Sequence, residues 1–482
     1  MPQPSQAALP DGLIAIVKRD CPTCVLIEPV LQQIASQKTI SVYTQDDPTF
    51  PSAMNPVDDT DLAISYQLDI ETVPTLLRIE DGVERARIIG WHRDQWNEFT
   101  GSQGLGTELP EMRPGCGSRS VEPGVAEALA QRFGDSRLQA RRVVLAPLED
   151  DVEACFDREW SDGLPVVPPT EERVARMLSG TQRQAEEIIG VIPPNQAECT
   201  VEKVAINAVM AGCKPEYLPV VIAAVEAACI DEFCMHGVLA TTYFSGPIVM
   251  VNGPIVKSIG MNFGINALGQ GNRANATIGR ALQLVIRNVG GGKPGGVDRA
   301  ALGNPGKYTF CFAENMENTS WQPHSVQQGF KEETSTVTLF AGNGVQPIMD
   351  QLSRTPESLA RTFAASLRSV GHAKLAPAGD VLLVVSPEHS RTFEAGGWSK
   401  NRLIDELMAL LQLPTSDLVR GVHGIAEGLP PAIAETHETR PKFRPGGLTA
   451  VRVGGTAGMF SAIISGWASS GERGSQPVIK AI

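Results

Sequence analysis

Two cysteines separated by two residues carry the clearest chemistry in this chain. Cys21 and Cys24 form a Cys-x-x-Cys motif, in which one thiolate can attack a disulfide and the other thiol can resolve the mixed disulfide. The run 12–17 (GLIAIV) predicts a buried strand, and the apolar spacing that follows the motif predicts a helix. Cys21 would then lie near a helix N-terminus, where backbone N–H groups and the helix dipole favour its thiolate.

Two other uses of this pair remain open. Cys21 and Cys24 could supply half of a zinc site, but no second Cys-x-x-Cys or Cys/His pair at ordinary spacing completes four ligands. They could also form a permanent structural disulfide. Cys234 and His236 would share one face of a strand, but two ligands alone do not make a metal site. We therefore predict no metal and no cofactor.

A second signal comes from a proline at the start of a later predicted strand. Pro74 follows Val73 and opens a run that ends at Asp81-Gly82, and a proline there is unusual without a special role such as a cis bond. Together with the dithiol, this order of elements resembles the thioredoxin family over about residues 1–102. The resemblance implies a thioredoxin-like fold in which Val73 faces the dithiol and Pro74 belongs to the redox site. Thioredoxins proper carry a different pair of residues between the cysteines.

Composition limits what the rest of the chain can do. A chain of 482 residues is too long for one ordinary hydrophobic core, so more than one domain is expected. Its content of 42% hydrophobic and 20% charged residues is typical of a globular protein. A net charge of −13 without a basic stripe argues against nucleic-acid binding. The sequence has no long apolar run and no leader-like start, so we expect no membrane association. Nine scattered cysteines fit a reducing cytoplasm.

Glycine and proline mark a domain boundary after the first hundred residues or so. The stretch 101–115 is rich in both, so we expect a thioredoxin-like domain at 1–102 and a linker at 103–120 that carries Cys116. Residues 121–482 would then form a larger mixed α/β domain, in one piece or in two lobes. The overall expectation is an α/β fold in which the small N-terminal domain is fused to this larger domain.

Cys116 is the first candidate for a second reactive thiol. Its glycine neighbours leave the backbone accessible, and the following amides could form an anion nest that lowers its pKa. The sequence Gly115-Cys116-Gly117-Ser118 weakly resembles a motif of reductase-like proteins. In that motif a selenocysteine or cysteine is followed by Gly, Ser and Cys at the start of a domain. Here Arg119 takes the last position, so a resolving thiol would have to come from elsewhere, such as the first domain. The alternative is a linker cysteine without a role.

Two further thiols lie beside charged residues. Cys213 precedes Lys214, which would favour its thiolate, and Glu216 could act as an acid or base. Cys311 ends a predicted strand, so Glu314 would lie at the strand's C-terminal end, where open α/β sheets place their sites. The plainer alternatives are a buried cysteine in a helix–helix turn and an ordinary loop carboxylate. The isolated histidines, such as His324, are expected on the surface or in the core.

A polar loop before a predicted helix is the candidate substrate site. Asn272, Arg273 and Asn275 end a Gly- and Asn-rich stretch from residue 252 and could bind a carboxylate or phosphate, together with Lys214. The stretch contains neither a Walker A motif nor a Rossmann fingerprint. The alternative is an elaborate turn in which Asn and Gly supply left-handed backbone positions.

These signals lead to one main hypothesis and one alternative. The main one is a thiol-dependent oxidoreductase, in which the dithiol domain serves a catalytic domain that acts on a small anionic molecule. Cys116, Cys213 or Cys311 would carry the covalent step, and a thioredoxin reductase or another thiol donor would be a partner. The alternative is a non-redox lyase or hydrolase with the first domain as a docking or sulfur-carrying module. We also expect a homo-oligomer.

Overall fold

The computed structural model describes residues 9–122, 125–133, 138–146, 149–421, 428–431, 438–467 and 474–482. The chain is mixed α/β with several sheets. It divides into two compact units: Met1–Arg137 with Glu171–Ala175 is unit 1, and Leu138–Thr170 with Arg176–Ile482 is unit 2.

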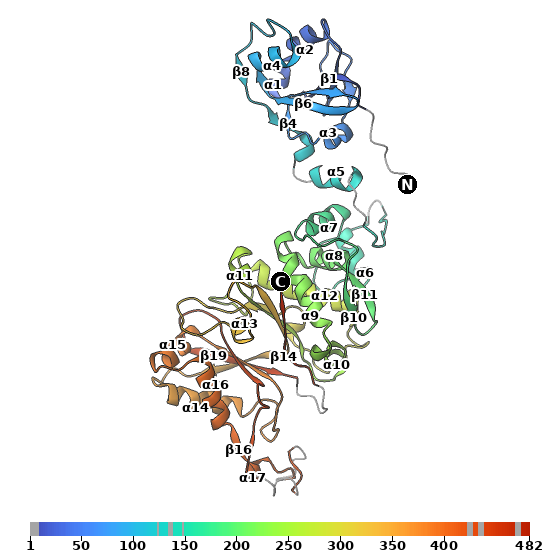
Figure 1. Ribbon diagram of the computed structural model, residues 1–482. Helices are drawn as coiled ribbons and strands as arrows, with labels where there is room; N and C mark the ends of the chain where they lie inside the picture. Colours follow the sequence, from blue (N-terminus) through green and yellow to red (C-terminus); the bar gives the residue numbers. More distant parts are fainter. Residues whose placement is uncertain are drawn as a thin grey trace. The chain divides into compact units, whose positions relative to one another are not determined.

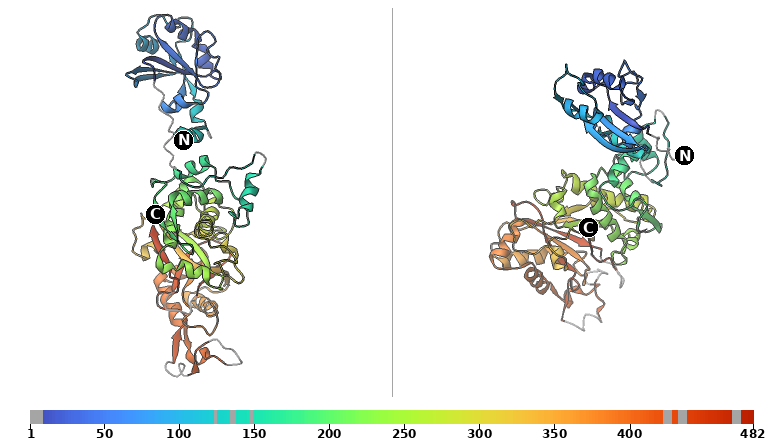
Figure 2. Two further views of the ribbon diagram at one scale, coloured as in Figure 1. Left: turned by 90° about the vertical axis from the view of Figure 1, so that its right-hand side faces the viewer. Right: turned by 45° about the horizontal axis from the view of Figure 1, so that its top comes forward.

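Unit 1 is built on a five-stranded sheet with the order β3-β2-β1-β5-β6. The central strand β1 pairs parallel with β2 and antiparallel with β5. Helices pack on this sheet (Figures 1 and 2). Its elements are β1 (Gly12–Val17), α1 (Pro22–Leu26), α2 (Glu28–Ala35), β2 (Ile40–Thr44), β3 (Val57–Asp58), α3 (Ala63–Gln67), β4 (Thr72–Val73), β5 (Thr75–Glu80), β6 (Val83–Ile89), β7 (Trp91–His92), α4 (Arg93–Thr100), β8 (Met112–Arg113), β9 (Cys116–Gly117) and α5 (Val125–Phe133).

The core of unit 1 explains why its first strand takes the central place. β1 is apolar along its length and five of its six residues are buried, as expected for a strand covered on both faces. Val30, Leu31 and Ile34 of α2 are buried in the same core, together with Trp91 and Trp96. The two tryptophan rings meet edge-on, with centroids 5.4 Å apart. This core fixes the end of β1, and therefore the position of the Cys-x-x-Cys motif.

Unit 2 contains a curled, half-barrel sheet of mixed direction. The strand order is β13-β12-β14-β19-β15-β18, and β20 also pairs with β14. Its strands are β10 (Ile188–Ile192), β11 (Ala197–Thr200), β12 (Gly246–Asn252), β13 (Cys311–Ala313), β14 (Thr336–Met349), β15 (Val381–Val385), β16 (Gln412–Pro414), β17 (Thr439–Pro441), β18 (Leu448–Arg452), β19 (Phe460–Gly466) and β20 (Val478–Ala481). The N–H of Asn315 donates to the carbonyl of Arg452 at 2.6 Å, which links the ends of β13 and β18.

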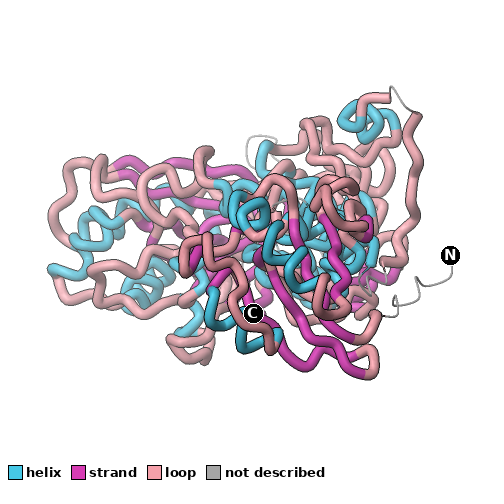
Figure 3. The backbone as a smooth tube through the Cα atoms, turned by 90° about the horizontal axis from the view of Figure 1, so that it is seen from above, coloured by secondary structure: helices cyan, strands magenta, loops and turns pink. Residues whose placement is uncertain are grey.

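Helices cover the sheet of unit 2. α8, α9 and α12 pack on one another, and α14, α15 and α16 pack against its other strands (Figure 1). Figure 3 shows helices lying beside the strands along the backbone. α9 is buried almost all round, as its uniformly apolar sequence predicts. The helices are α6 (Asp151–Asp157), α7 (Glu171–Leu178), α8 (Val201–Ala211), α9 (Leu218–Ala228), α10 (Met235–Ala240), α11 (Ile255–Ser258), α12 (Arg273–Asn288), α13 (His324–Gln327), α14 (Pro356–Leu367), α15 (Pro387–Ala395), α16 (Lys400–Leu410) and α17 (Thr415–Leu418), of which α7 spans the boundary between the units.

The alternation of side chains gives the sheet of unit 2 two separate apolar faces. Leu383 of β15 belongs to the core on one face, with α14 and α16, while Leu382 belongs to the core on the opposite face. Ile248 and Met250 of β12 share the face of Leu382. Neighbouring residues of a strand point to opposite faces, so this division follows from the strand geometry.

Candidate functional site

Three thiols meet at the end of β1 in unit 1. Cys21 caps the N-terminus of α1, and its Sγ accepts a hydrogen bond from the N–H of Cys24 at 3.4 Å. The Sγ atoms of Cys21 and Cys116 lie 2.9 Å apart. The carbonyl oxygen of Val73 is 3.6 Å from Cys21 Sγ, and the Val73–Pro74 bond is cis. The structure therefore brings Cys116 together with Cys21, Cys24 and Pro74, the three residues expected at the redox site. Val73 lies beside them.

The three thiols differ strongly in acidity. The pKa of Cys21 is lowered from 9.0 to about 5, chiefly by hydrogen bonding to the Cys24 thiol, with further bonds from Cys116 and backbone N–H groups outweighing burial. Burial and the nearby Cys21 thiolate raise the pKa of Cys24 far above its ordinary value. Burial and hydrogen bonding to Cys21 also raise the pKa of Cys116. At neutral pH the arrangement is thus one thiolate that accepts hydrogen bonds from two thiols.

A short strand holds Cys116 against Cys21. Thr72 and Val73 of β4 pair antiparallel with Gly117 and Cys116 of β9. The N–H of Ser118 donates to the carbonyl of Glu71 at 2.9 Å, just beyond this pairing. A Cβ at Gly115 would lie 2.4 Å from the Cγ2 of Thr72, so only glycine allows this close approach.

The same segment is attached at its other end. Met112 and Arg113 of β8 pair with β7, and the hydroxyl of Thr23 donates to the carbonyl of Pro114 at 2.7 Å. Thr23 lies between the two cysteines of the motif, so this bond ties the segment directly to the dithiol loop. The segment 103–120, expected to be a linker, therefore pairs with β4 and β7 of unit 1, and Cys116 packs against its core.

Burial separates the three thiols into an inner pair and an outer thiol. Cys21 and Cys24 are both 0% exposed, whereas Cys116 is partly exposed. Cys116 was expected in a linker between the two domains, and in the structure it belongs to unit 1. The pairing of β9 with β4, which is distant in sequence, places Cys116 in unit 1. The Gly/Pro-rich stretch before Cys116 does not indicate this pairing.

The other two candidate thiols, Cys213 and Cys311, lie in unit 2. Both are buried, and burial raises the pKa of Cys213 to about 12 and that of Cys311 even further. Lys214 does not hold Cys213 as a thiolate, since its ammonium instead lies 3.8 Å from the carboxylate of Glu216 at the surface. A buried thiol of high pKa is a weak nucleophile. Cys116 is partly exposed and contacts Cys21 within unit 1, so the geometry favours Cys116 as the partner of the dithiol.

The side-chain amides of the polar loop before α12 form hydrogen bonds with the loop itself. The side chain of Asn275 is buried and bonds the carbonyls of Asn262 and Ala267 and the N–H of Asn262. The side chain of Asn272 caps α12 and donates to the carbonyl of Gly260. Arg273 donates from Nε to the carbonyl of Gly212 at 2.9 Å. These residues, predicted to bind an anion, hold the loop in shape in the structure.

Glu314 lies in a buried polar cluster of unit 2. Its carboxylate accepts bonds from Lys400 Nζ at 2.7 Å, Asn252 Nδ2 at 2.6 Å and the N–H of His324 at 2.7 Å. Burial alone would raise the pKa of Glu314, but the Lys400 ammonium and the His324 N–H together hold it below its ordinary value. A carboxylate held by three donors is a poor general base.

Sequence reasoning missed the partners of Glu314, because they come from distant elements. Lys400 begins α16, and its side chain is only 2% exposed. Burial lowers the pKa of His324 to about 4, so its ring is neutral at pH 7. A charged residue at the first position of a helix usually faces water, so nothing in the sequence indicated a buried Lys400.

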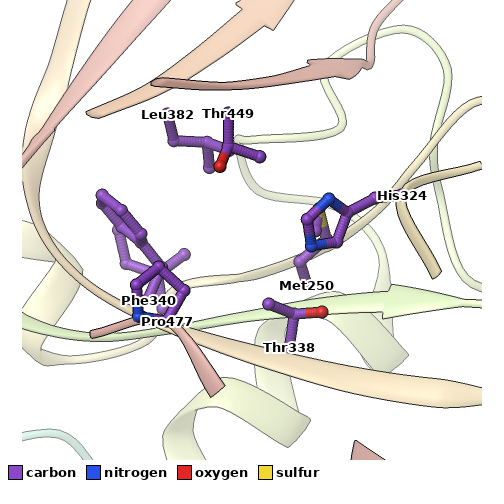
Figure 4. Close-up of a pocket in the computed structure, with 8 residues that line it drawn as sticks. Met250, His324, Thr338, Phe340, Leu382, Thr449 and Pro477 are labelled. Carbon is purple, nitrogen blue, oxygen red and sulfur yellow. The ribbon is translucent and has the colours of Figure 1, made fainter. Parts of the chain in front are cut away.

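A small cavity lies beside His324 on the face of the sheet that carries Leu382. Figure 4 shows the His324 ring with Met250 and Thr338, and Leu382 and Thr449 across the cavity. Among the described residues, the hydroxyl of Thr338 is one of several buried polar atoms without a hydrogen-bond partner. The cavity is thus a small, mostly apolar space with three polar side chains at its edge, those of His324, Thr338 and Thr449.

Three remaining points concern the Cys234/His236 pair, metal binding and membrane-spanning helices. Cys234 precedes the helix α10, which contains His236, so the two do not lie on a strand as expected. Within the described ranges, no group of three His, Cys, Asp or Glu side chains is placed to hold a metal ion. In the same part of the chain, no helix is long and apolar enough to cross a membrane.

Comparison of the chain with protein-family models, with curated proteins and with solved structures finds no match.

Proposed function

We propose that the protein is a thiol–disulfide oxidoreductase whose redox centre is the Cys21/Cys24 pair of unit 1. The observation that carries this proposal is the hydrogen-bonded Cys21 thiolate, whose pKa is lowered to about 5. A thiolate at neutral pH is the reactive form in disulfide exchange and also the better leaving group. Cys24 supplies the second thiol, which forms the Cys21–Cys24 disulfide and releases the partner.

We further propose that unit 1 has a thioredoxin-like fold. The central parallel pair β1 and β2, the antiparallel strands β5 and β6, and the placement of the dithiol after β1 support this. The cis bond before Pro74 lies beside Cys21, as the resemblance implies. In this proposal unit 1 is the reductant for chemistry on a small anionic molecule, and a thioredoxin reductase or another thiol donor restores it.

The test is a map of the disulfides that form under limiting oxidant. The reduced protein is treated anaerobically with less than one equivalent of diamide, alkylated, digested and analysed by mass spectrometry. The proposal expects a Cys21–Cys24 disulfide that dithiothreitol reverses, with Cys213 and Cys311 still alkylated. Finding Cys21 and Cys24 still as thiols while other cysteines have been oxidised would refute it.

A second candidate is a non-redox lyase or hydrolase in unit 2. The observation that favours it is the buried Glu314–Lys400 pair beside a neutral His324 and a cavity, because perturbed titratable groups at a cavity often mark active sites. Once a turnover assay exists, the double variant Cys21→Ser/Cys24→Ser separates the two candidates. The redox proposal expects this variant to lose reductant-coupled turnover. The second candidate expects turnover to stay unchanged.

A further inference from the structure

The thiolate of the redox centre is not the thiol that solvent reaches. Cys21 and Cys24 are 0% exposed, and the segment that carries Cys116 pairs with β4 directly beside them. Cys116 is partly exposed, while its Sγ contacts Cys21 Sγ at 2.9 Å. Any oxidant that approaches this centre therefore meets Cys116 before it meets Cys21.

We propose that Cys116 is the thiol that reacts with external disulfides or oxidants, and that Cys21 and Cys24 form an internal pair that reduces Cys116 afterwards. This inference rests on the proposed oxidoreductase function and reverses the usual expectation that the first cysteine of the motif attacks the external partner. It gives the third thiol a catalytic role in unit 1.

Glutathione disulfide illustrates the complete sequence. The Cys116 sulfur attacks one sulfur of glutathione disulfide, and the proton of its thiol passes through the Cys21 thiolate to the departing glutathione. The Cys21 thiolate then attacks the Cys116 sulfur and expels the second glutathione as a thiolate. Finally Cys24 attacks Cys21 and its proton passes to the departing Cys116 sulfur, which leaves a Cys21–Cys24 disulfide and Cys116 as a thiol. Two electrons have moved from the dithiol to glutathione disulfide, which becomes two glutathione molecules.

The geometry fits each role in this sequence. Cys21 is held as a thiolate in contact with Cys116, so it is placed to attack whatever bond forms at that sulfur. Cys116 donates its S–H to this thiolate, so its proton already has an acceptor. Cys24 is protonated and buried behind Cys21, and it is needed only for the last step.

The experiment follows one reaction in four proteins. Reduced wild type, Cys21→Ser, Cys24→Ser and Cys116→Ser are mixed with glutathione disulfide, quenched with acid at intervals, alkylated and mapped by mass spectrometry. We expect glutathione to stay on Cys116 in Cys21→Ser, and a Cys21–Cys116 disulfide to accumulate in Cys24→Ser. Cys116→Ser should react at least about tenfold more slowly than wild type, because reaction at Cys21 then requires local opening.

The same data separate this inference from the proposed function. If Cys116→Ser forms the Cys21–Cys24 disulfide as fast as wild type, and Cys24→Ser carries glutathione on Cys21, the inference is overturned while the function stands. If the wild type never forms the Cys21–Cys24 disulfide, the proposed function itself fails, and this inference fails with it.

A glycine substitution tests the covering segment without removing a thiol. A Cβ at Gly115 would meet Thr72 Cγ2 at 2.4 Å and the Val73 carbonyl oxygen at 2.8 Å, so Gly115→Ala should displace the segment from β4. Gly117→Ala is the matched control, because its Cβ would meet no atom within 4 Å. In the Cys24→Ser background, Gly115→Ala should move glutathione onto Cys21, and Gly117→Ala should not. An unchanged product pattern with Gly115→Ala would overturn the role of the segment.

Discussion

The acidity of Cys21 is the property on which the proposed chemistry depends, and it can be titrated directly. With a pKa of about 5 in place of 9.0, Cys21 is about 99% thiolate at pH 7, whereas an ordinary thiol is about 1% thiolate. Thiolates absorb in the ultraviolet, so the difference in absorbance between reduced wild type and Cys21→Ser reports this one group. Cys24 and Cys116 do not interfere at low pH, because their pKa values are raised.

Two variants test the cause of the shift. Cys24→Ala removes the hydrogen bond that contributes most, and Cys116→Ala removes a smaller one. A hydrogen bond to a charged group contributes about 1.5–3 kcal/mol, which corresponds to roughly one to two pH units. We expect the midpoint of Cys21 to rise by about that amount in Cys24→Ala and by less in Cys116→Ala. A wild-type midpoint near 9, or a larger shift in Cys116→Ala than in Cys24→Ala, would refute the reasoning.

The lowered pKa also makes stability depend on pH. The thiol of Cys21 is protonated in the unfolded chain below pH 9.0 and in the folded protein only below about 5. The thiolate therefore stabilises the folded state fully above pH 9, and this contribution is lost as the pH falls toward 5. It amounts to at most about 5 kcal/mol, with a slope of up to about 1.4 kcal/mol per pH unit. The measurement is denaturant unfolding of the reduced proteins at several pH values. The unfolding free energy of wild type minus that of Cys21→Ser should show this slope.

Further predictions concern unit 2, each read from denaturant unfolding. Glu314→Gln should destabilise by about 3–5 kcal/mol because it leaves the buried Lys400 ammonium unpaired. The double variant with Lys400→Met should cost clearly less than the sum of the single variants, and additive costs would contradict the pairing. His324, with its pKa of about 4, should cost up to about 3 kcal/mol of stability as the pH falls from 6.5 to 4, and His324→Gln should remove this loss. Asn275→Ala should destabilise by about 1–3 kcal/mol by leaving the loop groups that it bonds unpaired, and an unchanged stability would contradict this structural role.

Local patterns in the sequence were sufficient to predict the strand that precedes the dithiol. The apolar run 12–17 predicted β1 within its observed bounds, since a short β-branched run between polar residues has few other structures open to it. The mixed α/β character of the larger part was also predicted. By contrast, Cys234 and His236 were predicted to lie on a strand, whereas Met235 begins the helix α10 in the structure.

Contacts between distant residues could not be predicted in this way. Cys116 meets Cys21 only because β9 pairs with β4, and two-residue strands leave no periodic pattern in a sequence. The buried partner of Glu314 comes from α16, far along the chain. The bonds that Asn272 and Asn275 make within their loop could not be predicted either, since an amide that binds an anion and one that holds a loop have the same sequence pattern.

The central claim is that three thiols in unit 1 act as one redox centre, and the reaction of Cys24→Ser with glutathione disulfide tests it most directly. The account predicts that the product is a Cys21–Cys116 disulfide with glutathione released, because the thiolate lies 2.9 Å from the Cys116 sulfur. A product that carries glutathione stably on either cysteine, with no bond between Cys21 and Cys116, would contradict the account.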